Sequence, residues 1–104
     1  MKKCFLVFIL VLFSVSVQAH QYIKGKIISM EVSYMPASII IVMDTGNTAC
    51  PAGTPLKWQN QSWDNNKIIQ SNALAAMLAG KKISFVINDN DTNCIGQYFY
   101  IHNE

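Results

Sequence analysis

The stretch WDNNKIIQSNALAAMLAGKKISFVI, residues 63–87, decides the fold because it encodes one helix followed at once by one strand. Apolar residues at helical spacing predict one broad apolar helix face made of Ile69, Ala73, Leu74, Met77 and Leu78. We expect a side chain among residues 64–66 to cap the start of the helix. Gly80 is expected to end it in the left-handed conformation. The β-branched run at 83–87 then predicts a strand.

Four further strands are predicted around this unit. Residues 28–34 alternate apolar and polar side chains, and Gly25 near the start of this strand marks a bulge or bend. Residues 39–43 form a β-branched run, 56–59 a short third strand, and 97–101 an aromatic-rich last strand. The resulting β-β-β-α-β-β order is that of the OB-fold, a five-stranded, partly open Greek-key barrel. We therefore expect a mainly β domain with one helix, placed between strands three and four.

The first 19 residues have the pattern of a secretory signal peptide. Lys2 and Lys3 precede an unbroken apolar run at 5–13, and Val17-Gln18-Ala19 is a small-x-small cleavage motif. The apolar run is too short for a membrane span. We therefore expect a signal peptide at 1–19, a single domain at 20–104 and a secreted or periplasmic location.

Two cysteines, Cys50 and Cys94, remain after this cleavage. In an oxidising compartment such a pair normally forms a disulfide. The two residues are 44 positions apart. Closing a loop of this length is worth about 4 kcal/mol in the chain-entropy model, which is an upper expectation. The sequence therefore predicts one disulfide, which would brace the small barrel.

The charge of the expected domain argues against polyanionic partners. Residues 20–104 contain six lysines, no arginine and six acidic residues, so their formal net charge is zero. Binding to a phosphate backbone depends on concentrated positive charge. We therefore expect no nucleic-acid partner and no binding to an anionic membrane surface.

The candidate ligand site is the polar and aromatic stretch at 57–64. Sugars present apolar C–H faces edged by hydroxyl groups, so a sugar site needs a flat ring beside amide and carboxylate groups. The predicted glycan-binding residues are Trp58, Asn60, Gln61, Trp63 and Asp64. For each tryptophan the alternative is packing against the helix, and the sequence leaves this alternative open.

Other chemistries have weaker support in the sequence. Asp89, Asp91 and Asn93 copy the first ligand positions of a calcium-binding EF-hand loop, but Cys94 and Tyr100 stand where glycine and glutamate are needed. His20, as the first residue of the processed chain, could bind copper together with a second histidine such as His102. The sequence shows no nucleophile–base arrangement. We therefore predict a protein that is not an enzyme and has no metal and no cofactor.

The chain resembles small secreted OB-fold proteins related to the binding subunits of subtilase-cytotoxin and pertussis-like bacterial toxins. The resemblance covers about residues 25–101. It is carried by the leader, a strand ending near Cys50, Trp63 before the helix, the Ala79-Gly80 helix end, the strand at 83–87 and Cys94. It implies a homo-oligomer, such as a pentamer, that recognises cell-surface glycans, with an enzymatic toxin A subunit as a further partner. No sugar-contacting residue is carried over from that group.

Two functions are therefore expected from the sequence. The first is a secreted, non-enzymatic binding module that recognises glycans weakly at each site and gains strength through multivalency. The alternative is a periplasmic protein-interaction factor of OB-fold type, such as an enzyme inhibitor or an envelope-stress protein. Native mass spectrometry distinguishes them, since a ring favours the first and a monomer the second.

Overall fold

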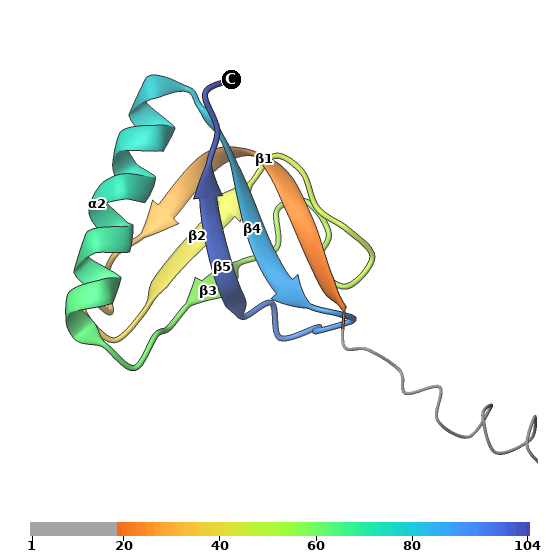
Figure 1. Cartoon of the computed structure of the whole chain (residues 1–104), viewed down its shortest axis with the longest axis horizontal. Coiled ribbons are helices and arrows are strands. Elements are labelled where there is room, and N and C mark those ends of the chain that lie inside the picture. The colour runs from red at the N-terminus through yellow and green to blue at the C-terminus, as the bar shows by residue number, and fades with distance from the viewer. Residues whose placement is uncertain (1–18) are drawn as a thin grey trace, which may run out of the picture.

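A computed structural model describes residues 19–104 as a mainly β domain with one helix (Figure 1). The predicted leader lies outside the described residues. The elements in chain order are β1 (His20–Glu31), β2 (Ile39–Met43), β3 (Leu56–Trp58), α2 (Trp63–Ala79), β4 (Lys82–Asn88) and β5 (Gly96–Ile101). This β-β-β-α-β-β order agrees with the order predicted from the sequence.

The five strands form one sheet in the order β3-β2-β1-β4-β5, in which all neighbouring strands are antiparallel. The long strand β1 pairs with two strands: its first part pairs with β4 and its last part with β2. The register with β2 shifts between Ile27 and Ser29, where the strand is bulged. A bulge bends a strand and increases its twist. The single strand β1 therefore joins both halves of a curled sheet.

Gly25 allows a loop to approach β1 closely. A side chain at this position would collide with Thr45, which donates a hydrogen bond to the Lys24 carbonyl over 2.7 Å. Asp44 accepts one from the Lys26 backbone N–H over 2.8 Å. The loop after β2 is thus fastened to β1 on both sides of the glycine.

The curled sheet closes where β3 meets β5. Lys57 and Ile95 form a parallel bridge, and the Lys57 N–H donates to the Cys94 carbonyl over 2.9 Å. The Cys50–Cys94 disulfide lies beside this bridge and is buried. It joins the loop between β2 and β3 to the residues that lead into β5. The predicted pairing of the two cysteines is therefore present.

The core fills the inside of the curled sheet. Phe85 and Trp58 lie there with apolar residues from every strand and with Ala73 and Ala76 of α2. Helix α2 lies along one side of the sheet (Figure 1). Ser62, and not a residue of 64–66, caps this helix by accepting a hydrogen bond from the Asn65 N–H, while Gly80 ends it with φ of 68° as predicted.

The sequence placed the first strand wrongly. It was expected at 28–34, but β1 begins at His20 and ends at Glu31. Ile28, Val32 and Tyr34 are exposed, and the inward positions are Ile23 and Ile27 before the bulge and Met30 after it. The bulge after Ile27 changes the inward positions from Ile23 and Ile27 to Met30, and the strand ends at Glu31, so the predicted alternation matches the structure only at Met30.

We expect the disulfide to contribute much of the stability of this small domain. Replacing both cysteines (Cys50→Ala with Cys94→Ala) should lower the free energy of unfolding by about 2–4 kcal/mol, because the unfolded chain regains the entropy of an open loop. Urea denaturation of the two proteins measures this difference. Reductant should destabilise the native protein by a similar amount and leave the double variant unaffected. Equal stability of the two oxidised proteins would contradict this account.

Candidate functional site

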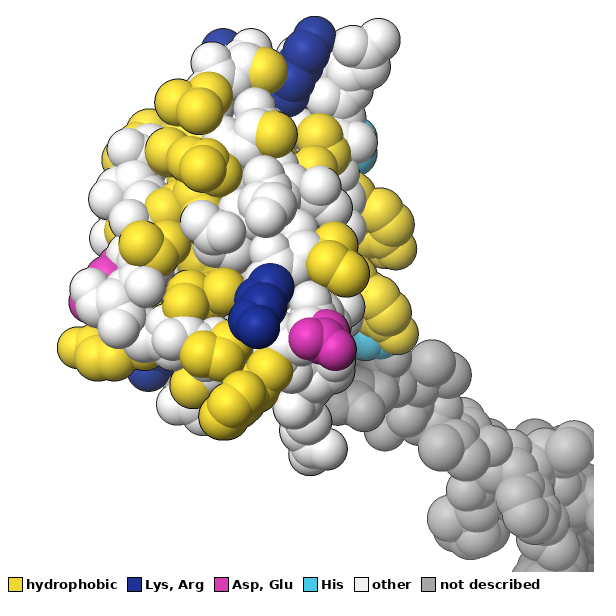
Figure 2. Space-filling model, turned by 90° about the vertical axis from the view of Figure 1, so that its left-hand side faces the viewer, with side chains coloured by type: hydrophobic (Ala, Val, Ile, Leu, Met, Phe, Trp, Pro, Cys, Tyr) yellow, Lys and Arg dark blue, Asp and Glu magenta, His cyan; other side chains and the backbone are white. Residues whose placement is uncertain are grey.

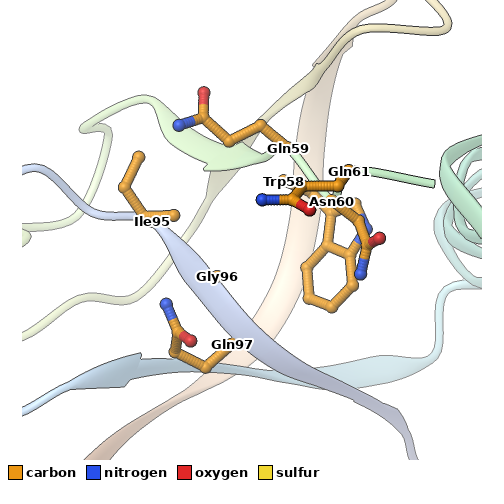
Figure 3. Close-up of a pocket in the computed structure, with 7 residues that line it drawn as sticks. All are labelled: Trp58, Gln59, Asn60, Gln61, Ile95, Gly96 and Gln97. Carbon is orange, nitrogen blue, oxygen red and sulfur yellow. The ribbon is translucent and has the colours of Figure 1, made fainter. Parts of the chain in front are cut away.

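A pocket of about 370 Å³ lies beside the closure of the sheet (Figure 3). Its walls come from two segments that are far apart in the sequence. One is the end of β3 with the following loop, residues 58–61, and the other is the start of β5, residues 95–97. A volume of this size lies within the usual range of small-molecule sites.

The pocket is lined by uncharged groups, most of them amides. The lining residues are Trp58, Gln59, Asn60, Gln61, Ile95, Gly96 and Gln97. Each amide side chain offers two N–H donors and a carbonyl acceptor, so it can match a hydroxyl group in either role. The three glutamines are exposed. The lining therefore suits a neutral ligand with many hydroxyl groups better than an ion.

The tryptophans occupy different environments. The Trp58 side chain is only 6% exposed; its indole N–H donates to Asn65 Oδ1 over 3.2 Å, and its ring meets Phe99 edge to face. Trp63 is 62% exposed at the first position of α2. The indole of Trp58 is therefore part of the core, and that of Trp63 is on the surface.

Three of the five predicted site residues, Trp58, Asn60 and Gln61, line the pocket, whereas Trp63 and Asp64 do not. The predicted arrangement of an open tryptophan ring beside amides is thus absent from the pocket. The predicted amides of Asn60 and Gln61 do line the pocket, and Gln97 of β5 adds another amide.

The sequence analysis missed the β5 half of the pocket. Gly96 is the informative residue there, because a Cβ at this position would lie 2.6 Å from Phe85 Cζ and 2.7 Å from Trp58 Cε3. A glycine within a strand often marks such a close approach. Gly96 thus lets β5 pass close over the core and brings Gln97 opposite the loop after β3.

Asn66 fixes the loop that forms the other wall. Its side chain is fully buried and donates to the carbonyls of Pro36, Ala37 and Asn60, at 2.6, 3.3 and 3.1 Å. Its carbonyl accepts from the Asn60 N–H over 3.2 Å. One helix side chain therefore holds two loops, and it sets the path of the backbone at Asn60.

The structure separates the two histidines considered as a metal pair. His20 lies opposite Asn88 at one end of β4. At the other end, the backbone N–H of His102 donates a hydrogen bond to the Lys82 carbonyl. Six residues of strand span about 20 Å. The histidines therefore cannot share one ion within this domain.

The acidic loop at 89–93 is organised by its own backbone. The two carboxylate oxygens of Asp91 accept hydrogen bonds from the N–H groups of Asn93 and Ile95. Among residues 19–104, no group of three or more His, Cys, Asp or Glu side chains is placed to hold a metal ion.

Within the same residues, no helix has both the length and the apolar character needed to cross a membrane.

Comparisons with protein-family models, with curated proteins and with solved structures give no match to this chain.

We expect Asn66 to be essential for the stability of the domain. The Asn66→Ala substitution leaves three carbonyls without their donor in a buried site, so it should lower the free energy of unfolding by about 2–4 kcal/mol. Denaturant titration measures the loss. Asn72→Ala, at an exposed position of the same helix, is the matched control and should stay within about 0.5 kcal/mol. A loss below about 1 kcal/mol at Asn66 would show that water replaces its hydrogen bonds.

Proposed function

We propose that the protein is a secreted, non-enzymatic binding module with an OB-type barrel that recognises glycans as a homo-oligomer, similar to the binding subunits of the toxins named above. The barrel assignment is supported by the strand order and by the parallel bridge that closes the sheet between β3 and β5. The helix also stands between strands three and four, where an OB-fold has it.

The amide-rich pocket is the observation that carries the glycan proposal. Its polar side chains, from Gln59, Asn60, Gln61 and Gln97, bear no charge, and each amide can both donate and accept. Sugar hydroxyl groups have the same double capacity. An anionic or cationic ligand would instead need a counter-charge in the lining, and the pocket offers none.

The outward face of α2 supports assembly into an oligomer. Large apolar side chains there are exposed, with fractions of 62% for Trp63, 60% for Ile68 and 77% for Leu78. The only charged residues of α2 are Asp64 and Lys67. Hydrophobic side chains gather on this side of the molecule (Figure 2). An apolar surface of this kind is typical of a protein–protein contact.

The same face also favours the alternative function, a periplasmic factor that binds a different protein. The two functions differ in the partner that covers α2. A second copy of the chain makes the domain multivalent for glycans, whereas an unrelated protein leaves it a monomer until that partner binds. The oligomeric state in isolation therefore decides between them.

We expect the oxidised protein to bind neutral glycans on an array through the pocket. Replacing two pocket amides together (Gln59→Ala with Gln97→Ala) should weaken binding by about tenfold, since each hydrogen bond contributes about 0.5–1.5 kcal/mol. Calorimetry with the best array ligand measures the change. Asn72→Ala, which removes an exposed amide away from the pocket, should bind normally. Unchanged binding by the double variant, or an array without signal, would refute the pocket proposal.

We expect native mass spectrometry to show a ring of identical subunits. Leu78→Lys places a charge on the apolar face of α2 and should shift the distribution towards monomer. Thr92→Lys adds the same charge on an exposed loop and should leave the ring intact. A wild-type monomer at micromolar concentration would instead favour the alternative function.

A further inference from the structure

A second group of aromatic side chains lies on the outer face of the sheet formed by β1, β4 and β5. Tyr22 of β1 and Tyr98 of β5 both pair with Val86 of β4, one from each side. Tyr100 pairs with Ser84, the next outward position on β4. We call Tyr22, Tyr98 and Tyr100 the tyrosine face. Their exposed fractions are 61%, 50% and 46%.

The rings of this face cover the strand between them. Val86 points away from the core, yet none of its surface is exposed, and Ser84 is only 4% exposed. The overlying tyrosine side chains account for this burial. The rings of Tyr22 and Tyr100 are nearly parallel, at 18°, with centroids 6.2 Å apart, and His20 meets Tyr98 edge to face. The rings are thus held against their neighbours, although they remain half open to solvent.

We propose that the tyrosine face is a second saccharide-binding site, distinct from the amide pocket, on which neutral sugar rings lie with their C–H faces against Tyr22 and Tyr100. This inference rests on the proposed glycan-binding function and adds a second site to it. Aromatic rings supply apolar area at low cost in side-chain entropy, and the tyrosine hydroxyls supply polar groups at its edge.

The size of the face fits a sugar better than a protein. An aromatic side chain buries about 150–250 Å², so three rings that are half exposed offer on the order of 300 Å². A stable protein interface needs about 800 Å² on each partner. One or two pyranose rings cover the smaller area. The tyrosine face alone is therefore too small for a lasting contact with a second protein.

Polar groups border the face at the end near Tyr100, and they are already paired with one another. Ser84 Oγ and His102 Nε2 are 2.7 Å apart, and Lys24 forms an ion pair with Glu104. The Lys24 ammonium donates a hydrogen bond to the Glu104 carboxylate and lowers the pKa of that group. Lys26 and Lys82, which pair across β1 and β4 in the next row, are also exposed, so this border carries a net positive charge. The preference for a neutral sugar therefore rests on the tyrosine rings and not on the border.

The test is a titration of the oxidised, isotope-labelled protein with cellobiose, lactose and maltose, followed by the NMR signals of its backbone amides. We expect shifts in β1, β4 and β5 around Val86, with dissociation constants in the millimolar range. Tyr22→Thr and Tyr100→Thr keep a good strand former and remove the ring. Each should weaken binding about threefold to tenfold. Tyr22→Phe keeps the ring and should bind nearly as well as the native protein.

Each other outcome has a defined meaning. Shifts confined to the pocket segments, residues 58–61 and 95–97, with none in β1, would overturn the tyrosine face and leave the pocket proposal standing. Loss of binding in Tyr22→Phe equal to that in Tyr22→Thr would overturn ring stacking. Shifts that depend on protein concentration without sugar would identify the face as a contact between copies. Absence of any response to the three sugars would overturn the inference, whereas the pocket is judged by its own array ligand. Unchanged core signals in the variants exclude misfolding.

Discussion

The structure depends on one contact, at which the two edge strands of the curled sheet, β3 and β5, meet. The parallel bridge between Lys57 and Ile95 is small, and β3 has only three residues. Such a short edge strand holds few hydrogen bonds. The Cys50–Cys94 disulfide lies directly beside the bridge and restricts both segments that approach it. The disulfide thus stabilises the contact between β3 and β5, where hydrogen bonds alone are few.

The pocket is a direct consequence of this closure. The chain leaves β3 at Trp58, whose ring enters the core, and the next three residues form one wall. On the other side β5 starts at Gly96, where the missing side chain lets the strand lie over Trp58 and Phe85. Asn66 then fixes the path of the loop at Asn60. The backbone of the pocket is held, while its glutamine side chains stay exposed. Ordering each such side chain on binding costs conformational entropy, so a single pocket would bind weakly.

Residue patterns predicted those parts of the fold that depend on local signals. The helix is such a case, since its apolar spacing and Gly80 lie within one segment, and β2, β4 and β5 are continuous β-branched or aromatic runs. The pattern failed at β1 because the alternation at 28–34 runs past the end of the strand at Glu31 and gives no sign of the inward residues before the bulge, Ile23 and Ile27. It also failed at α2, where exposed Leu74 and Leu78 were assigned to the buried face. A helix that is apolar on both sides carries no signal for which side meets the core.

The candidate site was likewise predicted only where its residues are close together in the sequence. Trp58, Asn60 and Gln61 were predicted together because they lie in one short stretch rich in amides, although Gln59 of the same stretch was not named. Gln97 was missed because only the pairing of β3 with β5 brings it to that loop, and no local pattern encodes a contact across so many residues. The buried role of Asn66 was equally invisible, since an asparagine near a helix start is most often a cap.

Few charged side chains lie on the three surfaces on which the proposals rest. The pocket, the tyrosine face and most of the outward face of α2 are uncharged, while the ion pair between Lys24 and Glu104 lies at a border. Without a concentrated field there is no long-range steering of a ligand, and recognition depends on contact alone. Small neutral contacts give low affinity, and the route to useful strength is to present several of them on one body. In the function that we propose, the apolar face of α2 would bring several copies together, and the assembly and the ligand sites would then serve one mode of binding.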